Sequence, residues 1–179
     1  MSSGIKFNEK DLFRRLEELS IEHETLAHSP LQTVAESKSL LPKLPGSHIK
    51  NLFLRDKKRT YFLLTVPQDR QINLKLLRTV IAARGTLSFG SAEALMELLG
   101  VKPGAVTPLS VINDKENRVS AFLDEGLIKT PIINAHPLRN DMTTSLSIDD
   151  LLKFMTAENH SPTLINFDDV DRYSGENTS

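Results

Sequence analysis

The 179-residue chain contains no cysteine and no tryptophan, and aromatic residues make up only 6% of it. The absence of cysteine excludes disulfide bridges, thiolate metal ligands and thiol nucleophiles. No apolar run approaches the roughly 18 residues that span a bilayer, and the polar segment from Met1 to Lys10 does not resemble a signal peptide. We therefore expect a soluble, cytoplasmic protein with no membrane partner. A hydrophobic content of 39% beside 25% charged residues predicts a folded domain.

Several catalytic motifs are also missing. The phosphate-binding patterns GxxxxGK[ST] and GxGxxG and the zinc motif HExxH do not occur. The five histidines are widely spaced, so a zinc site would need ligands from distant segments. The segment Gly85–Gly90 resembles a nucleophile elbow, but it has one residue too many before Ser88 and follows a helical pattern instead of a strand. We expect neither a metal nor a cofactor, and Ser88 is better explained as a turn or wall residue than as a nucleophile.

Charge is balanced over the whole chain but unevenly distributed along it. The sequence has 22 basic and 23 acidic residues, a formal net charge of −1. Residues 38–84 contain eleven basic and two acidic residues, whereas residues 141–179 contain two basic and eight acidic ones. The basic segment can meet a polyanion such as a nucleic acid while the acidic end faces away. Two solvated faces of opposite charge would explain the same distribution.

The hydrophobic pattern predicts one domain of mixed α/β class. Helices are predicted over residues 8–20, 33–41, 73–81, 91–99 and 147–155. Short strands are predicted over residues 23–28, 49–55, 60–66, 86–89, 109–112, 119–123, 131–135, 142–145 and 163–167. Residues 56–59 would form the strongly basic tip of a hairpin. Helices and strands do not alternate regularly, which disfavours a doubly wound parallel sheet.

A lysine beside leucines is the first unusual feature among the predicted strands. Because side chains alternate along a strand, Lys50, Leu52 and Leu54 share one face, and Asn51 and Phe53 share the other. Burying a lysine is costly unless it meets an anion. The alternative is that Lys50 lies at the open end of the strand and extends into water.

Two loops carry polar groups in fixed backbones. Residues 100–108 contain two glycines and two prolines, which constrain the chain and can leave amide or carbonyl groups facing outward. Such a loop can bind a small ligand, or it is an ordinary rigid turn. Further along, His136 is held extended before Pro137, with Asn140 four residues later. These side chains offer fixed donors and acceptors, although a hydrogen-bonded structural histidine would fit the same pattern.

Four segments in this order closely resemble the prolyl-tRNA editing domain family, also called the YbaK/prolyl-tRNA-synthetase-associated domain. They are Lys50-Asn-Leu-Phe-Leu-Arg-Asp-Lys-Lys58, Leu87–Phe89, Gly100–Pro108 and His136–Asn140. The resemblance runs from about residue 20 to 167. It implies an editing domain over residues 1–170, with a many-stranded mixed sheet, curved or barrel-like, flanked by helices. Residues 171–179 would be an acidic, flexible tail.

The activity implied by the resemblance is hydrolysis of the ester that joins a wrong amino acid to tRNA(Pro), without a covalent nucleophile, metal or cofactor. The chain looks most like a free-standing, trans-acting member of the branch that deacylates alanyl-tRNA(Pro). Its partners would be tRNA(Pro) mischarged with alanine and, as a further candidate, prolyl-tRNA synthetase. Hydrolysis of cysteinyl- or seryl-tRNA remains an alternative, as does a non-catalytic module that binds tRNA or a synthetase.

The resemblance also assigns roles to single residues. Lys50 would bind the phosphate or ribose of the terminal adenosine, and Asn51 would orient the aminoacyl end. The backbone of Gly104 would position water or the substrate's α-amino group, and His136 would shape a small pocket and contact the aminoacyl group or the terminal ribose. Further substrate-binding residues would be Asn51, Ser88, Phe89, Val106, Thr107, Pro108 and Asn140. Contacts to tRNA would come from Arg55, Lys57, Lys58 and Arg59.

Overall fold

The computed structural model describes residues 4–30 and 44–169. Its α-helices are α1 (Glu9–Glu18), α3 (Leu74–Val80), α4 (Ala92–Leu99) and α5 (Ile148–Ala157), and its 3₁₀ helices are η2 (Pro108–Asn113) and η3 (Glu125–Lys129). The strands are β1 (Glu24–Ala27), β2 (Ser47–Arg55), β3 (Tyr61–Pro67), β4 (Ser88–Phe89), β5 (Val119–Asp124), β6 (Ile132–Ala135), β7 (Met142–Ser147) and β8 (Thr163–Ile165). None of the helices within these described ranges is both long and apolar enough to cross a membrane.

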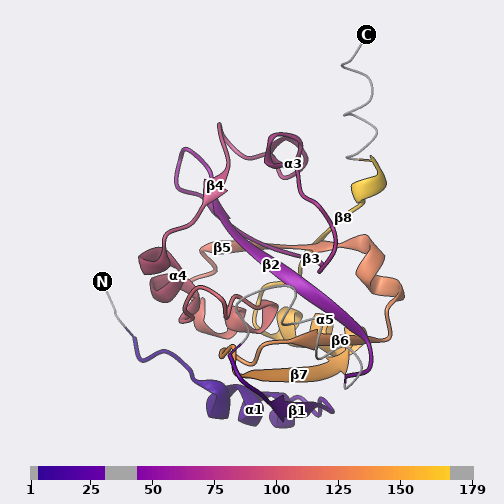
Figure 1. Ribbon diagram of the computed structural model, residues 1–179. Coiled ribbons are helices and arrows are strands. Elements are labelled where there is room, and N and C mark those ends of the chain that lie inside the picture. The colour runs from indigo at the N-terminus through magenta and orange to yellow at the C-terminus, as the bar shows by residue number, and fades with distance from the viewer. Residues whose placement is uncertain (1–3, 31–43, 170–179) are drawn as a thin grey trace.

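The eight strands form one mixed sheet in the order β1-β7-β6-β2-β3-β5-β8, with β4 paired to β2. The long strand β2 joins the two halves of this sheet and runs diagonally between them in Figure 1. Its first residues, Ser47 and His48, pair in parallel with β6, and the segment from Ile49 to Arg55 pairs antiparallel with β3. The predicted single domain, with a mixed sheet flanked by helices, is confirmed.

Alternate side chains of β2 pack into two separate hydrophobic cores. Phe53 is buried in the larger core, with residues of α1, α4 and α5. Leu54 is buried in the smaller core, where Leu77 of α3 packs, and Leu52 lies against that core as well. The predicted alternation is therefore confirmed at the apolar positions, and it places Lys50 and Asn51 on opposite faces of β2.

Side-chain caps explain why several helices begin where the sequence predicts. Asn8 and Asp11 form a reciprocal capping box at the start of α1. Asn73 accepts hydrogen bonds from two backbone amides of α3, and Ser147 accepts one from the amide of Asp150. Gly100 ends α4 with a left-handed backbone, φ = +66°, as the predicted glycine stop requires.

One predicted strand is wrong, and two predictions lie outside the described residues. The apolar run from Leu109 to Ile112 belongs to the 3₁₀ helix η2, which Thr107 caps and Pro108 begins. All six residues of η2 are buried, so the run has no exposed positions whose spacing would distinguish a helix from a strand. The helix predicted over residues 33–41 and the tail predicted over residues 171–179 both fall outside the described ranges.

Candidate functional site

Lys50 lies on β2 near the point where this strand leaves β6 and continues beside β3. Its side chain is half-buried, and it forms no hydrogen bond or ion pair with any residue in 4–30 or 44–169. A half-buried ammonium group without an ion-pair partner among the described residues is suited to receive an anion from a ligand.

Asn51 ties β2 to the loop that follows α4. Its side-chain Nδ2 donates a hydrogen bond of 3.1 Å to the backbone oxygen of Val106. Its Oδ1 accepts a hydrogen bond of 2.6 Å from the hydroxyl of Thr65, the residue opposite it on β3. These bonds fix the side-chain orientation of Asn51 and hold the segment around Val106 against β2, on the face opposite to the Lys50 side chain.

The two predicted loops lie side by side at Gly104. This glycine has φ = +91°, a backbone conformation that side chains disfavour, and a Cβ added to it would lie 3.5 Å from Nδ2 of Asn140. Gly104 is exposed, whereas Ala105 beside it is buried. The backbone of Gly104 is therefore accessible to a ligand next to the Asn140 side chain.

His136 is the first residue of the second loop, residues 136–140. Its Nδ1 lies 2.9 Å from the backbone oxygen of Met142; since a carbonyl only accepts, Nδ1 carries the proton and neutral His136 has a lone pair on Nε2. Burial lowers the pKa of His136, and nearby His28 adds to this, although the bond to Met142 opposes it. Arg139 in the same loop bonds Asp141 and also Glu9 of α1, which anchors the loop.

Two more histidines, His28 and His48, lie near His136 and are not among the predicted site residues. The ring of His28 is 6.4 Å from that of His136. His48 pairs across the sheet with Asn134, and the pKa of His48 is lowered mainly by burial and also by His136. The clue in the sequence was that His48 precedes Lys50 by two residues and so shares its face of the strand. In the described ranges, no group of three or more histidine or acidic side chains is arranged to hold a metal ion.

Thr107 and Pro108 are buried beneath the site. The Thr107 hydroxyl accepts a hydrogen bond from the amide of Leu109, and the Thr107 carbonyl accepts one from the hydroxyl of Ser110. These bonds of Thr107 fix the backbone next to Val106, and the burial of Thr107 and Pro108 leaves little surface for a ligand.

Ser88 and Phe89 lie away from the loop that contains Gly104. They form β4, which pairs with Arg55 and Leu54 at the far end of β2. Arg55 is five residues beyond Lys50 on β2, a separation of about 17 Å along an extended strand. The structure thus separates the predicted residues into one group linked to the Gly104 loop, with Asn51, Val106 and Asn140, and a second group around Arg55. Lys50 is the neighbour of Asn51 on β2, with its side chain on the other face of the strand.

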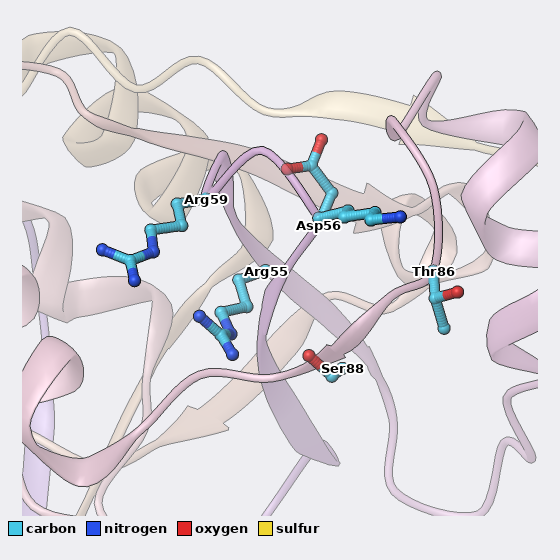
Figure 2. A pocket seen from close by; sticks show the side chains of 6 residues that line it. Arg55, Asp56, Arg59, Thr86 and Ser88 are labelled. Atoms are coloured by element: carbon cyan, nitrogen blue, oxygen red, sulfur yellow. The ribbon is translucent and has the colours of Figure 1, made fainter.

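The second group surrounds a cleft of about 380 Å³ at the tip of the β2–β3 hairpin, lined by Arg55, Asp56, Lys57, Arg59, Thr86 and Ser88. Lys58 is exposed at the same tip. Figure 2 shows the side chains of Arg55 and Arg59 extending to the same side of the hairpin, while Asp56 points away from them. Two guanidinium groups therefore face a common, solvent-accessible space.

Comparison with known proteins identifies the family. The family model described as "Aminoacyl-tRNA editing domain" matches residues 28–154. The mouse protein "Prolyl-tRNA synthetase associated domain-containing protein 1" is 40% identical over 164 residues, which cover 88% of this chain and 95% of the mouse protein. The chain belongs to the aminoacyl-tRNA editing domain family. A bacterial relative, "Prolyl-tRNA editing protein ProX" of Acetoanaerobium sticklandii, is 34% identical over 148 residues, covering 82% of this chain and 90% of ProX.

Solved structures share the fold of this editing domain. A structure titled as hypothetical protein APE2540 matches with a TM-score of 0.69 and 17% identity, covering 87% of this chain and 97% of that one. Another structure, described as a candidate trans-editing enzyme for prolyl-tRNA synthetase, has a TM-score of 0.68 and 18% identity. The match covers 91% of this chain and 98% of that one. The family resemblance predicted from the sequence is confirmed, and membership of the family supports a trans-editing role.

Proposed function

We propose that this protein removes a wrong amino acid from tRNA(Pro), acting in trans on alanyl-tRNA(Pro) in the cytoplasm. The observation that carries the proposal is the half-buried side chain of Lys50, which has no hydrogen-bond or ion-pair partner among the described residues. The editing family and the name of the relative ProX support the reaction class.

In this proposal, Lys50 binds the phosphate or ribose of the terminal adenosine and holds the ester in place. Water attacks the ester carbonyl, the ester C–O bond breaks, and free amino acid and tRNA are released. An aminoacyl ester is already activated, so a fixed orientation and nearby dipoles supply much of the catalysis. The exposed backbone of Gly104 positions water or the α-amino group, and the Nε2 lone pair of neutral His136 accepts a hydrogen bond from the aminoacyl group or the ribose.

Amino-acid choice follows from pocket size. A site for alanine excludes the larger proline by its walls, which is a sharper criterion than the roughly 1–3 kcal/mol that one methylene changes in binding. Val106, two residues after Gly104 and only partly buried, is a side chain that would form such a wall. The same chemistry on cysteinyl- or seryl-tRNA is the nearest alternative. A non-catalytic module that binds tRNA or prolyl-tRNA synthetase is the alternative from a different class.

The test is the variant Lys50→Ala, with exposed Lys10→Ala on α1 as a matched control. Loss of a group that positions the reacting atoms lowers the rate by about 10²-fold. We expect a fall of that size in alanyl-tRNA(Pro) deacylation for Lys50→Ala, no change for Lys10→Ala, and unchanged thermal unfolding in both. Full activity in Lys50→Ala would disprove the role of this lysine.

A further inference from the structure

The cleft at the hairpin tip lies five residues along β2 from Lys50, and its composition suits an anion. Its lining provides the side chains of Arg55, Lys57 and Arg59 together with the hydroxyls of Thr86 and Ser88. Guanidinium groups bind phosphate oxygens through paired, charge-assisted hydrogen bonds, and hydroxyl groups donate to the remaining oxygens. Arg55, the last residue of β2, and Arg59, in the turn between β2 and β3, extend to the same side of the hairpin (Figure 2).

Asp56 also lines the cleft, but its carboxylate does not cancel the attraction of the cleft for an anion. Asp56 is almost fully buried, and its carboxylate accepts hydrogen bonds of 2.9 Å from the backbone amides of Lys58, Thr60 and Arg84. Burial alone would raise the pKa of Asp56, but these amides outweigh it and lower the pKa. The charge of Asp56 is therefore engaged by the backbone, away from the two guanidinium groups.

The same bonds make the cleft rigid before any ligand binds. The amide of Lys57 donates a hydrogen bond of 3.1 Å to the backbone oxygen of Arg84, which joins the hairpin tip to the segment before β4. Gly85 has φ = +87°, and an added Cβ would lie 2.9 Å from Cβ of Lys57, so the two segments are in close contact. A site that is already ordered loses less entropy on binding.

We infer that this cleft binds one backbone phosphate of the tRNA, upstream of the terminal nucleotide whose ester lies at Lys50. The inference rests on the proposed function. The separation of about 17 Å along β2 is too long for both groups to contact the terminal adenosine. Ser88, predicted to be a substrate-binding residue, would contact this phosphate together with Arg55 and Arg59, which were predicted to contact tRNA. The cleft thereby makes the protein prefer esters carried on a polynucleotide over esters of a single nucleoside.

The experiment compares two substrates in two double variants. The substrates are alanyl-tRNA(Pro) and the 3′-alanyl ester of adenosine, which has no phosphate. The test variant is Arg55→Gln with Arg59→Gln, and the control is Lys10→Gln with Arg14→Gln, which removes two exposed cations from α1. Circular dichroism and thermal unfolding establish that both variants fold. The readout is the ratio of kcat/KM for the tRNA to kcat/KM for the nucleoside ester, measured at several salt concentrations.

The inference predicts that this ratio falls about tenfold or more in the test variant, a loss of roughly one specific phosphate contact, and stays at the wild-type value in the control. The slope of log(kcat/KM) for tRNA against log[salt] should become shallower by about 1 to 2. An equal fall on both substrates, or no fall, would overturn the inference. Weaker binding to prolyl-tRNA synthetase with an unchanged ratio would overturn it in favour of a protein partner.

Failure of the proposed function gives a different result, because the wild-type protein would then hydrolyse neither ester. In that case the affinity for uncharged tRNA(Pro), measured by fluorescence anisotropy, still decides the inference. Weaker and less salt-dependent binding in the test variant than in the control supports the phosphate site. Equal binding contradicts it.

Discussion

Nδ2 of Asn51 and the backbone oxygen of Val106 lie 3.1 Å apart, and this hydrogen bond links β2 directly to the loop that contains Gly104. Asn51 and Val106 are fifty-five positions apart in the sequence. The bond therefore fixes how the lysine on β2 lies relative to the glycine loop. Because Thr65 donates to the other end of the Asn51 amide, the side chain is held from both sides.

The variant Asn51→Asp should weaken both the fold and the activity. A carboxylate can still accept from Thr65, but it cannot donate to Val106, and it places two acceptor oxygens against each other. We expect the free energy of unfolding to fall by about 1–3 kcal/mol, with a larger loss of kcat/KM because the loop around Gly104 moves. The control is Thr65→Val, which removes the other hydrogen bond and leaves the bond to Val106 intact. Wild-type deacylation by Asn51→Asp would refute the linking role.

Gly104→Ala tests the backbone of the exposed loop. The added methyl group has room, since its nearest neighbour is Asn140 Nδ2 at 3.5 Å, but φ = +91° is unfavourable for alanine. We expect a loss of about 1–2 kcal/mol in the free energy of unfolding, together with a loss of deacylation that exceeds what the lower stability explains. Gly4→Ala is the control, because a Cβ there meets nothing within 4 Å. Equal behaviour of the two variants would contradict the assignment.

Two variants of His136 distinguish the roles of its two ring nitrogens. Asparagine can replace the Nδ1 donor to Met142 but has no group at the position of Nε2, whereas glutamine can reach the Nε2 position and loses the bond to Met142. We expect His136→Asn to keep the wild-type melting temperature and to lose about tenfold in kcat/KM, roughly one hydrogen bond. His136→Gln should instead lower the melting temperature. Retained activity in His136→Asn would show that Nε2 has no role.

The same histidine predicts a pH profile. His136 is faced by His28, His48 and Asp141, and its pKa is lowered chiefly by burial. The ring therefore stays neutral to a pH below the ordinary value of about 6.5. Deacylation by the wild-type protein should not decline between pH 8 and pH 6.5 through protonation of this ring. A decline with its midpoint above pH 6.5, absent in His136→Asn, would be inconsistent with this environment.

His160 should stabilise the protein more at low pH than at high pH. Its ring nitrogens lie 2.6 Å from the backbone oxygen of Glu158 and 2.8 Å from the carboxylate of Asp114. Burial opposes protonation, but these two acceptors outweigh it and raise the pKa of His160. A raised pKa contributes stability that is fully present below the unfolded-state pKa of about 6.5 and is lost as pH rises through the folded-state pKa.

Urea unfolding of the wild-type protein and His160→Gln at pH 5.5, 7 and 8.5 measures this effect. We expect the variant to be less stable by about 1.5–3 kcal/mol at pH 5.5, the usual value of a charge-assisted hydrogen bond. The difference should shrink as pH rises. A difference that grows toward pH 8.5 would exclude a charged His160.

Local rules predicted much of the fold, because they act within a few residues of one another. The cap at Asn73, the glycine stop at Gly100 and the alternation along β2 all follow from neighbouring sequence. The run from Leu109 to Ile112 failed because burial on all sides removes the periodicity that distinguishes a helix from a strand.

The candidate site could be predicted only in part. His48 lies near His136 because β2 pairs in parallel with β6, and this pairing joins segments that are far apart in the sequence. Ser88 was predicted to bind substrate together with residues of the Gly104 loop, but β4 pairs with the tip end of β2 and places Ser88 at the basic cleft. No rule based on spacing indicates which end of a strand a distant two-residue strand will join.

The most direct test of the central claim is single-turnover deacylation of tRNA(Pro) charged separately with alanine, cysteine, serine and proline. We predict that the wild-type protein hydrolyses the alanyl ester fastest and leaves prolyl-tRNA(Pro) intact. Faster hydrolysis of the cysteinyl or seryl ester would contradict the assigned amino acid. Binding of tRNA(Pro) with no hydrolysis of any of the four esters would contradict the editing function itself.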